Sequence, residues 1–189
     1  MSIMIVILLV AVPVILVVVW AVFTSNNLIA KRNRVLQCRS SISVSLKQRN
    51  DLIPNLVSTV KAYMGYESEL LERIAEIRTR TLHESDEDSI ASGSELSSLL
   101  SSLNLAVERY PDLKADVQFL SLQNRITEME IELQAVRRTY NAAVTDYNNS
   151  IQTFPASLIA AYGKHSPETL IEIPDSETGS VSVTELFEK

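Results

Sequence analysis

The feature that most constrains this chain is an apolar run near its N-terminus. No polar side chain occurs from Ile3 to Phe23. A helix of that length is long enough to cross a hydrocarbon core of about 30 Å. The run is longer than the apolar region of a typical signal peptide, no Lys or Arg precedes it, and no small-x-small cleavage site follows it. We therefore predict an uncleaved transmembrane anchor over residues 1–27, with a cleaved signal peptide as the alternative.

The residues that flank this run predict its orientation. Trp20 lies near the end of the run, where an indole suits the water interface. Four cations follow the run, whereas only the amino terminus carries positive charge on the other side: Lys31, Arg32, Arg34 and Arg39. The positive-inside rule then predicts a cytoplasmic C-terminal domain. These cations can contact anionic lipid headgroups or form a solvated helix face.

The net charge bears on the expected partners, and the cysteine content bears on the cellular compartment. The 17 basic and 23 acidic residues give a formal charge of −6, so nucleic acid is not expected as a partner. The single cysteine, Cys38, cannot form an internal disulfide, which fits a reducing compartment.

Two long helical patterns follow the anchor. The chain has only 4 glycines and shows no sustained two-residue alternation before its tail, which predicts an all-α fold. One apolar seam with three-four spacing runs from Leu28 to Tyr63, with Arg49 as its one charged residue. A second seam belongs to the longest predicted helix, which begins at Pro111 and is closed by Phe154 and Pro155.

Two shorter helices are expected between the long ones. They cover about 68–81 and about 92–107, and the acidic stretch at 83–94 is predicted to be a loop. Ser92 and Glu95 have the spacing of a capping box at the start of the second of these helices. We predict an antiparallel bundle with two long and two shorter helices over residues 28–155, followed by a partly irregular tail over 156–189.

Pro54 lies on the first seam without shifting its phase. A proline here is more consistent with a kink in one continuous helix than with a break between two. Pro54 removes a backbone donor and frees the carbonyl of Asn50, and Arg49, Asp51 and Asn55 surround the defect. Two interpretations stay open: a structural kink whose polar groups repair the bundle, or a recognition site held open by the kink.

A seven-residue repeat marks the longest helix. Tyr140 and Tyr147 are seven residues apart, as are Asn141 and Asn148, so each pair lies on one helix face. We interpret the tyrosines as core residues and the asparagines as seam-edge groups that hydrogen-bond a neighbouring helix. If a second copy supplies that helix, the pair becomes an assembly surface.

Catalytic patterns are lacking in the sequence. His83 and His165 have no partner at metal-ligand spacing, and we interpret both as solvated. Cys38 lies on a helix seam and is interpreted as a small core residue rather than a nucleophile. The acidic stretch lacks the spacing of a calcium loop. We therefore expect no enzyme activity, no cofactor and no bound metal.

Three stretches carry a family resemblance. "RNDLIPNLVSTVKAY", "YPDLKADVQFLSLQNRI" and "VRRTYNAAVTDYNNSIQTFP", in this order after the anchor, resemble the LemA family over nearly the whole chain. This resemblance implies a bacterial inner-membrane protein with a cytoplasmic helical bundle, no established enzymatic activity and a role in membrane organisation or stress. The family pattern falls on Arg49, Asp51, Leu52, Ile53, Pro54, Asn55, Leu56, Tyr110, Pro111, Leu113, Arg137, Tyr140, Asn141, Tyr147, Asn148, Phe154 and Pro155. It departs from the family at Tyr66, where a histidine usually precedes the acid that is here Glu67.

Two functions fit these features. The first is a scaffold that self-associates on the membrane and organises or shapes it, because long helices offer more side surface than two shorter ones can cover. The second is an adaptor that presents the bundle to a membrane protease or another membrane enzyme. Membrane lipid, a second copy and a membrane protein are thus the expected partners.

Overall fold

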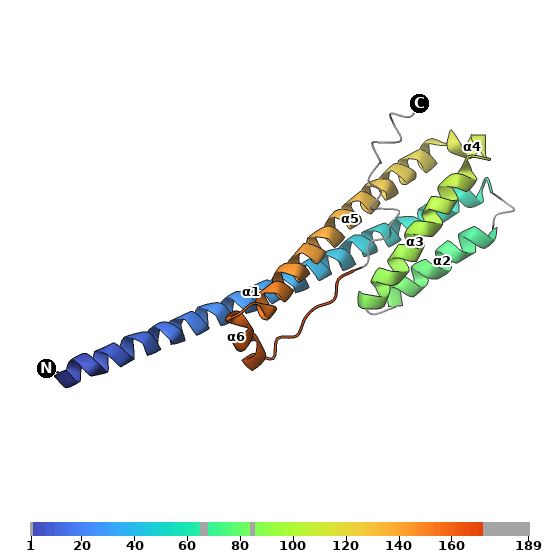
Figure 1. Cartoon of the computed structure of the whole chain (residues 1–189). Helices are drawn as coiled ribbons and strands as arrows, with labels where there is room; N and C mark the ends of the chain where they lie inside the picture. The colour runs from blue at the N-terminus through green and yellow to red at the C-terminus, as the bar shows by residue number, and fades with distance from the viewer. Residues whose placement is uncertain (1, 65–67, 84–85, 172–189) are drawn as a thin grey trace, which may run out of the picture. The chain divides into compact units, whose positions relative to one another are not determined.

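The computed structural model describes residues 2–64, 68–83 and 86–171, and no strand occurs among them. The helices are α1 (Ser2–Lys61), α2 (Ser68–His83), α3 (Asp86–Val107), α4 (Pro111–Lys114), α5 (Val117–Gln152) and α6 (Ala156–Tyr162), as labelled in Figure 1. The all-α class is confirmed, with two long helices, two shorter ones and two short additional turns. Tyr66, Glu67 and the end of the tail, over 172–189, lie outside the described residues.

α1 passes through Pro54 as one continuous helix, as predicted. Proline at this position leaves the carbonyl of Asn50 without its usual donor four residues later. Arg78 of α2 supplies the missing donor, with its Nε 3.0 Å from the Asn50 oxygen. The repair therefore comes from a neighbouring helix and not from the polar residues next to Pro54.

The chain divides into two compact units. One combines residues 1–33 with 140–189, and the other comprises residues 34–139. α1 and α5 each contribute to both units, since both helices extend beyond one range. The predicted domain boundaries at residues 27 and 155 stay a prediction.

In the unit of residues 34–139, α1 and α5 run antiparallel. Arg49 contacts Glu130, whereas Tyr63, further along the chain, contacts Asp116, which comes earlier in sequence than Glu130. α2 and α3 pack side by side (Figure 1). The core cluster of this unit is Ile53, Leu56, Val60, Met64, Leu71, Ile74, Ile77, Leu96, Leu99, Leu100, Leu103, Ala106, Val107, Leu113, Phe119 and Ile126. Met64 is buried at the end of the first seam, and the predicted seam residue Tyr63 is exposed.

The predicted acidic loop is wrong, because α3 already begins at Asp86. Gly93 lies inside α3, where a Cβ would come within 2.6 Å of Leu46 Cδ2. The glycine thus permits close packing of α3 on α1. Ser92 and Glu95 are inside the helix and do not cap it; Glu95 instead forms an ion pair with Arg80.

The predicted fourth helix is also interrupted, because α4 ends at Lys114 and α5 begins at Val117. Asp116 lies in the gap, and its Oδ1 accepts a hydrogen bond of 2.8 Å from the backbone N–H of Phe119. This is an N-cap for α5. The bond from Phe119, followed by the bond from the Tyr63 hydroxyl, lowers the pKa of Asp116 below its ordinary value.

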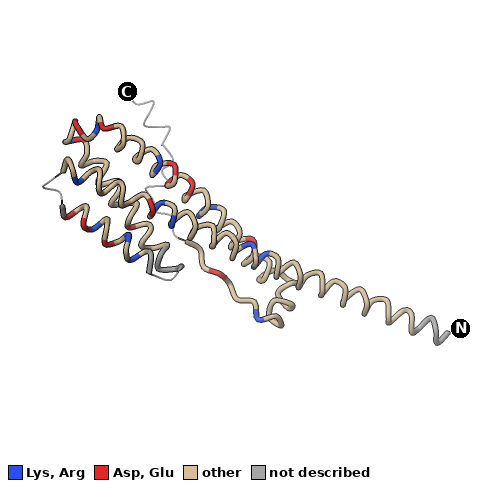
Figure 2. Tube along the Cα trace, turned by 180° about the vertical axis from the view of Figure 1, so that it is seen from behind, with Lys and Arg blue, Asp and Glu red and all other residues tan. Residues whose placement is uncertain are grey.

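The unit that contains both termini carries the predicted anchor. α1 has a window with a mean hydropathy of 2.9 that is wholly exposed, long and apolar enough to cross a membrane. Figure 2 shows no charged residue along the N-terminal part of this helix. Among the described residues of this unit, the buried side chains are Leu28, Tyr140, Ala143, Val144, Tyr147, Ile151 and Ala160. After α6, residues 165–171 form neither helix nor strand.

Candidate functional site

Two asparagines of α5 hold the chain after α6 by its backbone. The side-chain amide of Asn148 donates to the carbonyl of Glu168 at 2.8 Å and accepts from the N–H of the same residue at 2.9 Å. Asn141 makes the same pair of bonds with Ile171, both at 2.9 Å. Each asparagine thus satisfies one donor and one acceptor of an irregular segment, as a neighbouring strand would.

The two asparagines match the spacing of the segment that they bind. Seven residues of α-helix rise about 10.5 Å. Three residues of extended chain, from Glu168 to Ile171, cover about 10 Å. Since Asn148 binds Glu168 and Asn141 binds Ile171, the segment runs antiparallel to α5.

The two tyrosines add one contact each. Tyr140 donates its hydroxyl proton to the carbonyl of Thr169 at 3.0 Å, and the Tyr147 oxygen lies 3.1 Å from His165 Nδ1. Tyr147 is buried, and burial is the main cause that raises the pKa of its hydroxyl above 10.0. The prediction of core tyrosines is confirmed by their burial. The interpretation of His165 as solvated is wrong, because the residue is half-buried and its ring contacts that of Tyr147.

We call Tyr140, Asn141, Tyr147 and Asn148 the α5 clamp. Five of its six hydrogen bonds to the segment involve backbone atoms of the segment. The segment's side chains at Ser166, Pro167, Thr169 and Leu170 are exposed. The clamp therefore recognises an extended backbone and places few demands on sequence. The sequence predicted that these asparagines hydrogen-bond a neighbouring helix. They instead bond to the chain's own tail.

A second polar centre surrounds Arg49 in the unit of residues 34–139. The guanidinium is fully buried, and its Nη1 lies 2.7 Å from Glu130 Oε1 on α5 and 2.8 Å from Ser97 on α3. Nη2 donates to the carbonyl of Gly93 at 3.0 Å. Glu130 also accepts a bond of 2.9 Å from Ser97. The one charged residue of the predicted seam thus joins three helices.

Arg137 reaches the same turn of α3. It is buried, and its Nη2 lies 3.2 Å from the hydroxyl of Ser94. Asp51, in contrast, is exposed. The hypothesis that Asp51 pairs with Arg49 or Arg137 inside the bundle is therefore wrong, and Glu130 is the carboxylate that pairs with Arg49.

The other sequence-predicted residues do not join either centre. Pro54, Asn55, Pro111, Phe154 and Pro155 are exposed, and Tyr110 packs partly buried against the core cluster. The four cations that follow the apolar run differ in their contacts and exposure. Lys31 lies 2.8 Å from Asp146 and 2.7 Å from Ser150, whereas Arg32 and Arg34 are exposed and Arg39 is half-buried.

Glu130, Gly93, Ser97 and the segment 165–171 were not identified from the sequence. Glu130 had a signal, because it lies seven residues before Arg137 on the same face of α5. A buried arginine also requires a carboxylate from a facing helix. The segment had none, since the clamp contacts its backbone and almost any sequence supplies that. No metal-binding cluster occurs within the part of the chain that the structure describes.

Comparison with known proteins agrees with the resemblance stated above. The model of the LemA family matches residues 39–184. A relative from Metamycoplasma hominis, named Protein LemA, is 30% identical over 138 residues, which are 71% of this chain and 63% of the relative. This chain therefore spans less than two thirds of the length of that curated relative.

Proposed function

Because this chain belongs to the LemA family, we propose that it is a non-catalytic, membrane-anchored helical scaffold that self-associates and organises or shapes the bacterial inner membrane. In this proposal the chain crosses the membrane once, with its N-terminus outside and its helical bundle in the cytoplasm.

The observation that carries the proposal is the composition of α1. This helix has a wholly exposed apolar window near its N-terminus. Its later part bears a buried seam that includes Val35, Ile42 and Ile53. No break separates the two parts, since α1 is assigned as one helix from Ser2 to Lys61. The same helix thus carries both the anchor window and part of the packed core.

Self-association is supported by a second stripe on α1. Leu36 and Val44 are 50% and 53% exposed, and Ser40 between them is exposed as well. Their spacing of four places them on one face, separate from the buried seam. Val44 also lines an open groove of about 510 Å³ together with residues of α5 that include Val136. A partner helix with an apolar stripe would cover this face, and copies anchored in one membrane share an orientation.

Light scattering and electron microscopy of the detergent-solubilised full chain test this proposal. We expect a homo-oligomer, and we expect Val44→Glu to shift it towards the monomer without loss of helix content. Lys61→Glu is the matched control, because this residue is exposed on α1 about 25 Å beyond Val44 along the helix. A monodisperse monomer before and after reconstitution into lipid would refute the scaffold.

The adaptor function is the other outcome that this experiment can reveal. Crosslinking in native membranes should give ladders of the chain with itself if it is a scaffold. A single band with a different membrane protein would favour an adaptor that presents its bundle to a membrane protease or similar enzyme.

A further inference from the structure

The region around α6 exposes an apolar stripe. Phe154, Leu158 and Tyr162 are 76%, 63% and 93% exposed. They follow one another in steps of four residues, so Leu158 and Tyr162 share one face of α6, and Phe154 precedes it at the same spacing. We call these three residues the α6 stripe.

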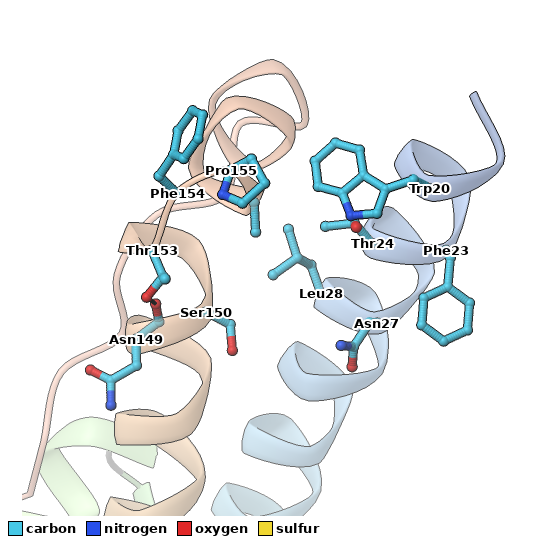
Figure 3. Close-up of a pocket in the computed structure, with 11 residues that line it drawn as sticks. Trp20, Phe23, Thr24, Asn27, Leu28, Asn149, Ser150, Thr153, Phe154 and Pro155 are labelled. Carbon is cyan, nitrogen blue, oxygen red and sulfur yellow. Dashed lines mark hydrogen bonds between the residues drawn. The ribbon is translucent and has the colours of Figure 1, made fainter. Parts of the chain in front are cut away.

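The stripe adjoins the end of the predicted anchor. An open pocket of about 510 Å³ is lined by Trp20, Phe23, Thr24 and Leu28 of α1 and by residues 149–150 and 153–156. Figure 3 shows the indole of Trp20 facing Pro155 across this pocket, whereas the rings of Phe154 and Phe23 point away from it. Phe23 is 73% exposed, so apolar exposure continues from α1 to the residues that lead into α6.

The depth of this region follows from the sequence of α1. The apolar run ends at Phe23, and the first charged residue is Lys31. Residues between these two points of a transmembrane helix lie at the boundary between acyl chains and headgroups, where Trp and other aromatic side chains are enriched. The pocket that joins α1 to the start of α6 is lined from this stretch, and so α6 begins at the same depth.

We propose that α6 is a second membrane contact, in which the α6 stripe inserts into the headgroup–acyl boundary of the bilayer beside the anchor. Short apolar faces of this kind bind the interface through their buried area. Tyrosine suits this position because its ring is apolar and its hydroxyl reaches water. Lys164, exposed two residues after the stripe, lies where it can meet anionic headgroups.

This contact would hold α6 and the anchor, which belong to one compact unit, at the membrane at two points. A single transmembrane helix permits rotation about its own axis, and a second insertion beside it removes that freedom. The proposal rests on the anchor but not on self-association, and it concerns the lipid surface alone.

Depth-dependent quenching of a single tryptophan tests the proposal. Trp20 is the only tryptophan of the chain, so Trp20→Phe combined with Leu158→Trp places one indole on the stripe. The full chain is reconstituted into phosphatidylcholine–phosphatidylglycerol vesicles with bromines at defined acyl carbons. We expect severalfold stronger quenching at position 158 by shallow bromines than by deep ones, and a blue shift of the emission.

The matched control is Trp20→Phe combined with Leu170→Trp. Leu170 is exposed too, but it lies in the clamped segment beside Asn141. Asn141 precedes Phe154 by 13 residues of chain, about 20 Å along a helix, so we expect no quenching there. Circular dichroism checks that both variants keep their helix content.

The outcomes separate this proposal from the anchor. Quenching at position 158 no stronger than at position 170, with the native Trp20 quenched in the unchanged protein, would overturn the α6 contact and leave the anchor intact. A native Trp20 that no bromine quenches would overturn both.

Discussion

At the residue scale, the buried Arg49 shows how one charge can organise a bundle. Taking a guanidinium out of water is costly unless a carboxylate and further acceptors surround it. Glu130, Ser97 and the carbonyl of Gly93 supply these from two other helices. The same arrangement suits a glycine in α3, because a Cβ at this position would displace the Leu46 side chain of α1.

We predict that Glu130→Gln destabilises the bundle by about 3 kcal/mol, since removal of one partner leaves a buried charge uncompensated. The value lies at the low end of that range because the Glu130 side chain is 22% exposed. Asp51→Asn is the control, and this exposed site should change stability by no more than about 0.5 kcal/mol. Thermal unfolding of the full chain in detergent, followed by circular dichroism, measures both. Equal losses would show that Glu130 does not neutralise Arg49.

Asp116 gives the bundle an acid-sensitive contact. Its pKa is lowered from 3.8 in the folded state, chiefly by the bond from the Phe119 N–H. A carboxyl whose folded pKa is depressed stabilises the fold fully above its unfolded pKa and loses this contribution as pH falls through the folded value. We therefore expect the melting temperature to fall more steeply below pH 3.8 in the unchanged protein than in Asp116→Asn.

Tyr63→Phe separates the two hydrogen bonds to Asp116. It removes the bond from the hydroxyl but keeps the backbone cap. Its acid sensitivity should fall between those of the unchanged protein and Asp116→Asn. Parallel pH profiles for all three proteins would contradict the assignment of the acid response to Asp116.

At the element scale, long helices were predictable and their interruptions were not. Apolar periodicity carried α1 through Pro54, since the period depends only on which residues face the core. The same periodicity predicted one continuous helix across residues 115–116. In the structure α4 ends before these residues, and Asp116 caps the start of α5. The start of α3 was missed because serine, glycine and acidic residues are typical of loops, and tertiary packing at Gly93 overrides that preference.

The clamp was predictable only in part. The seven-residue repeats predicted core tyrosines and seam-edge asparagines on α5, and the tyrosines are buried whereas the asparagines are half-buried. What they bind could not be deduced, because hydrogen bonds to a backbone leave no trace in the sequence of the bound segment. A local sequence pattern thus identifies the side chains that make such a contact but not the backbone segment that they bind.

We predict that Asn148→Ala releases the segment at Glu168 without unfolding the helices. Both bonds to the Glu168 backbone are lost, so its amide should exchange hydrogen faster while the melting temperature changes little. Asn149→Ala is the matched control, because this neighbouring asparagine is exposed and lies outside the clamp. Hydrogen exchange with mass spectrometry measures the difference. Unchanged exchange at Glu168 would mean that the asparagine does not hold the segment.

At the scale of the whole molecule, topology is the property that most needs measurement. Lys31 is engaged with Asp146, which leaves Arg32 and Arg34 as exposed cations directly after the anchor. These two and Arg39 follow the apolar run, and the positive-inside rule predicts that they lie in the cytoplasm. We expect protease added to intact spheroplasts to spare the bundle and to digest it after lysis. Digestion without lysis would invert the orientation.

The α5 clamp also fixes the number of residues between the two positions of the tail that it binds. Asn141 and Asn148 form two hydrogen-bonded rungs that are seven residues, or about 10.5 Å, apart on α5. Only three residues of extended chain fit between these rungs. Substitutions between Glu168 and Ile171 leave this commensurate spacing unchanged, because the rungs read only the main chain. Insertion or deletion of a single residue shifts one rung by about 3.3 Å, more than a hydrogen bond can stretch. The segment thus tolerates changes of sequence but not changes of length.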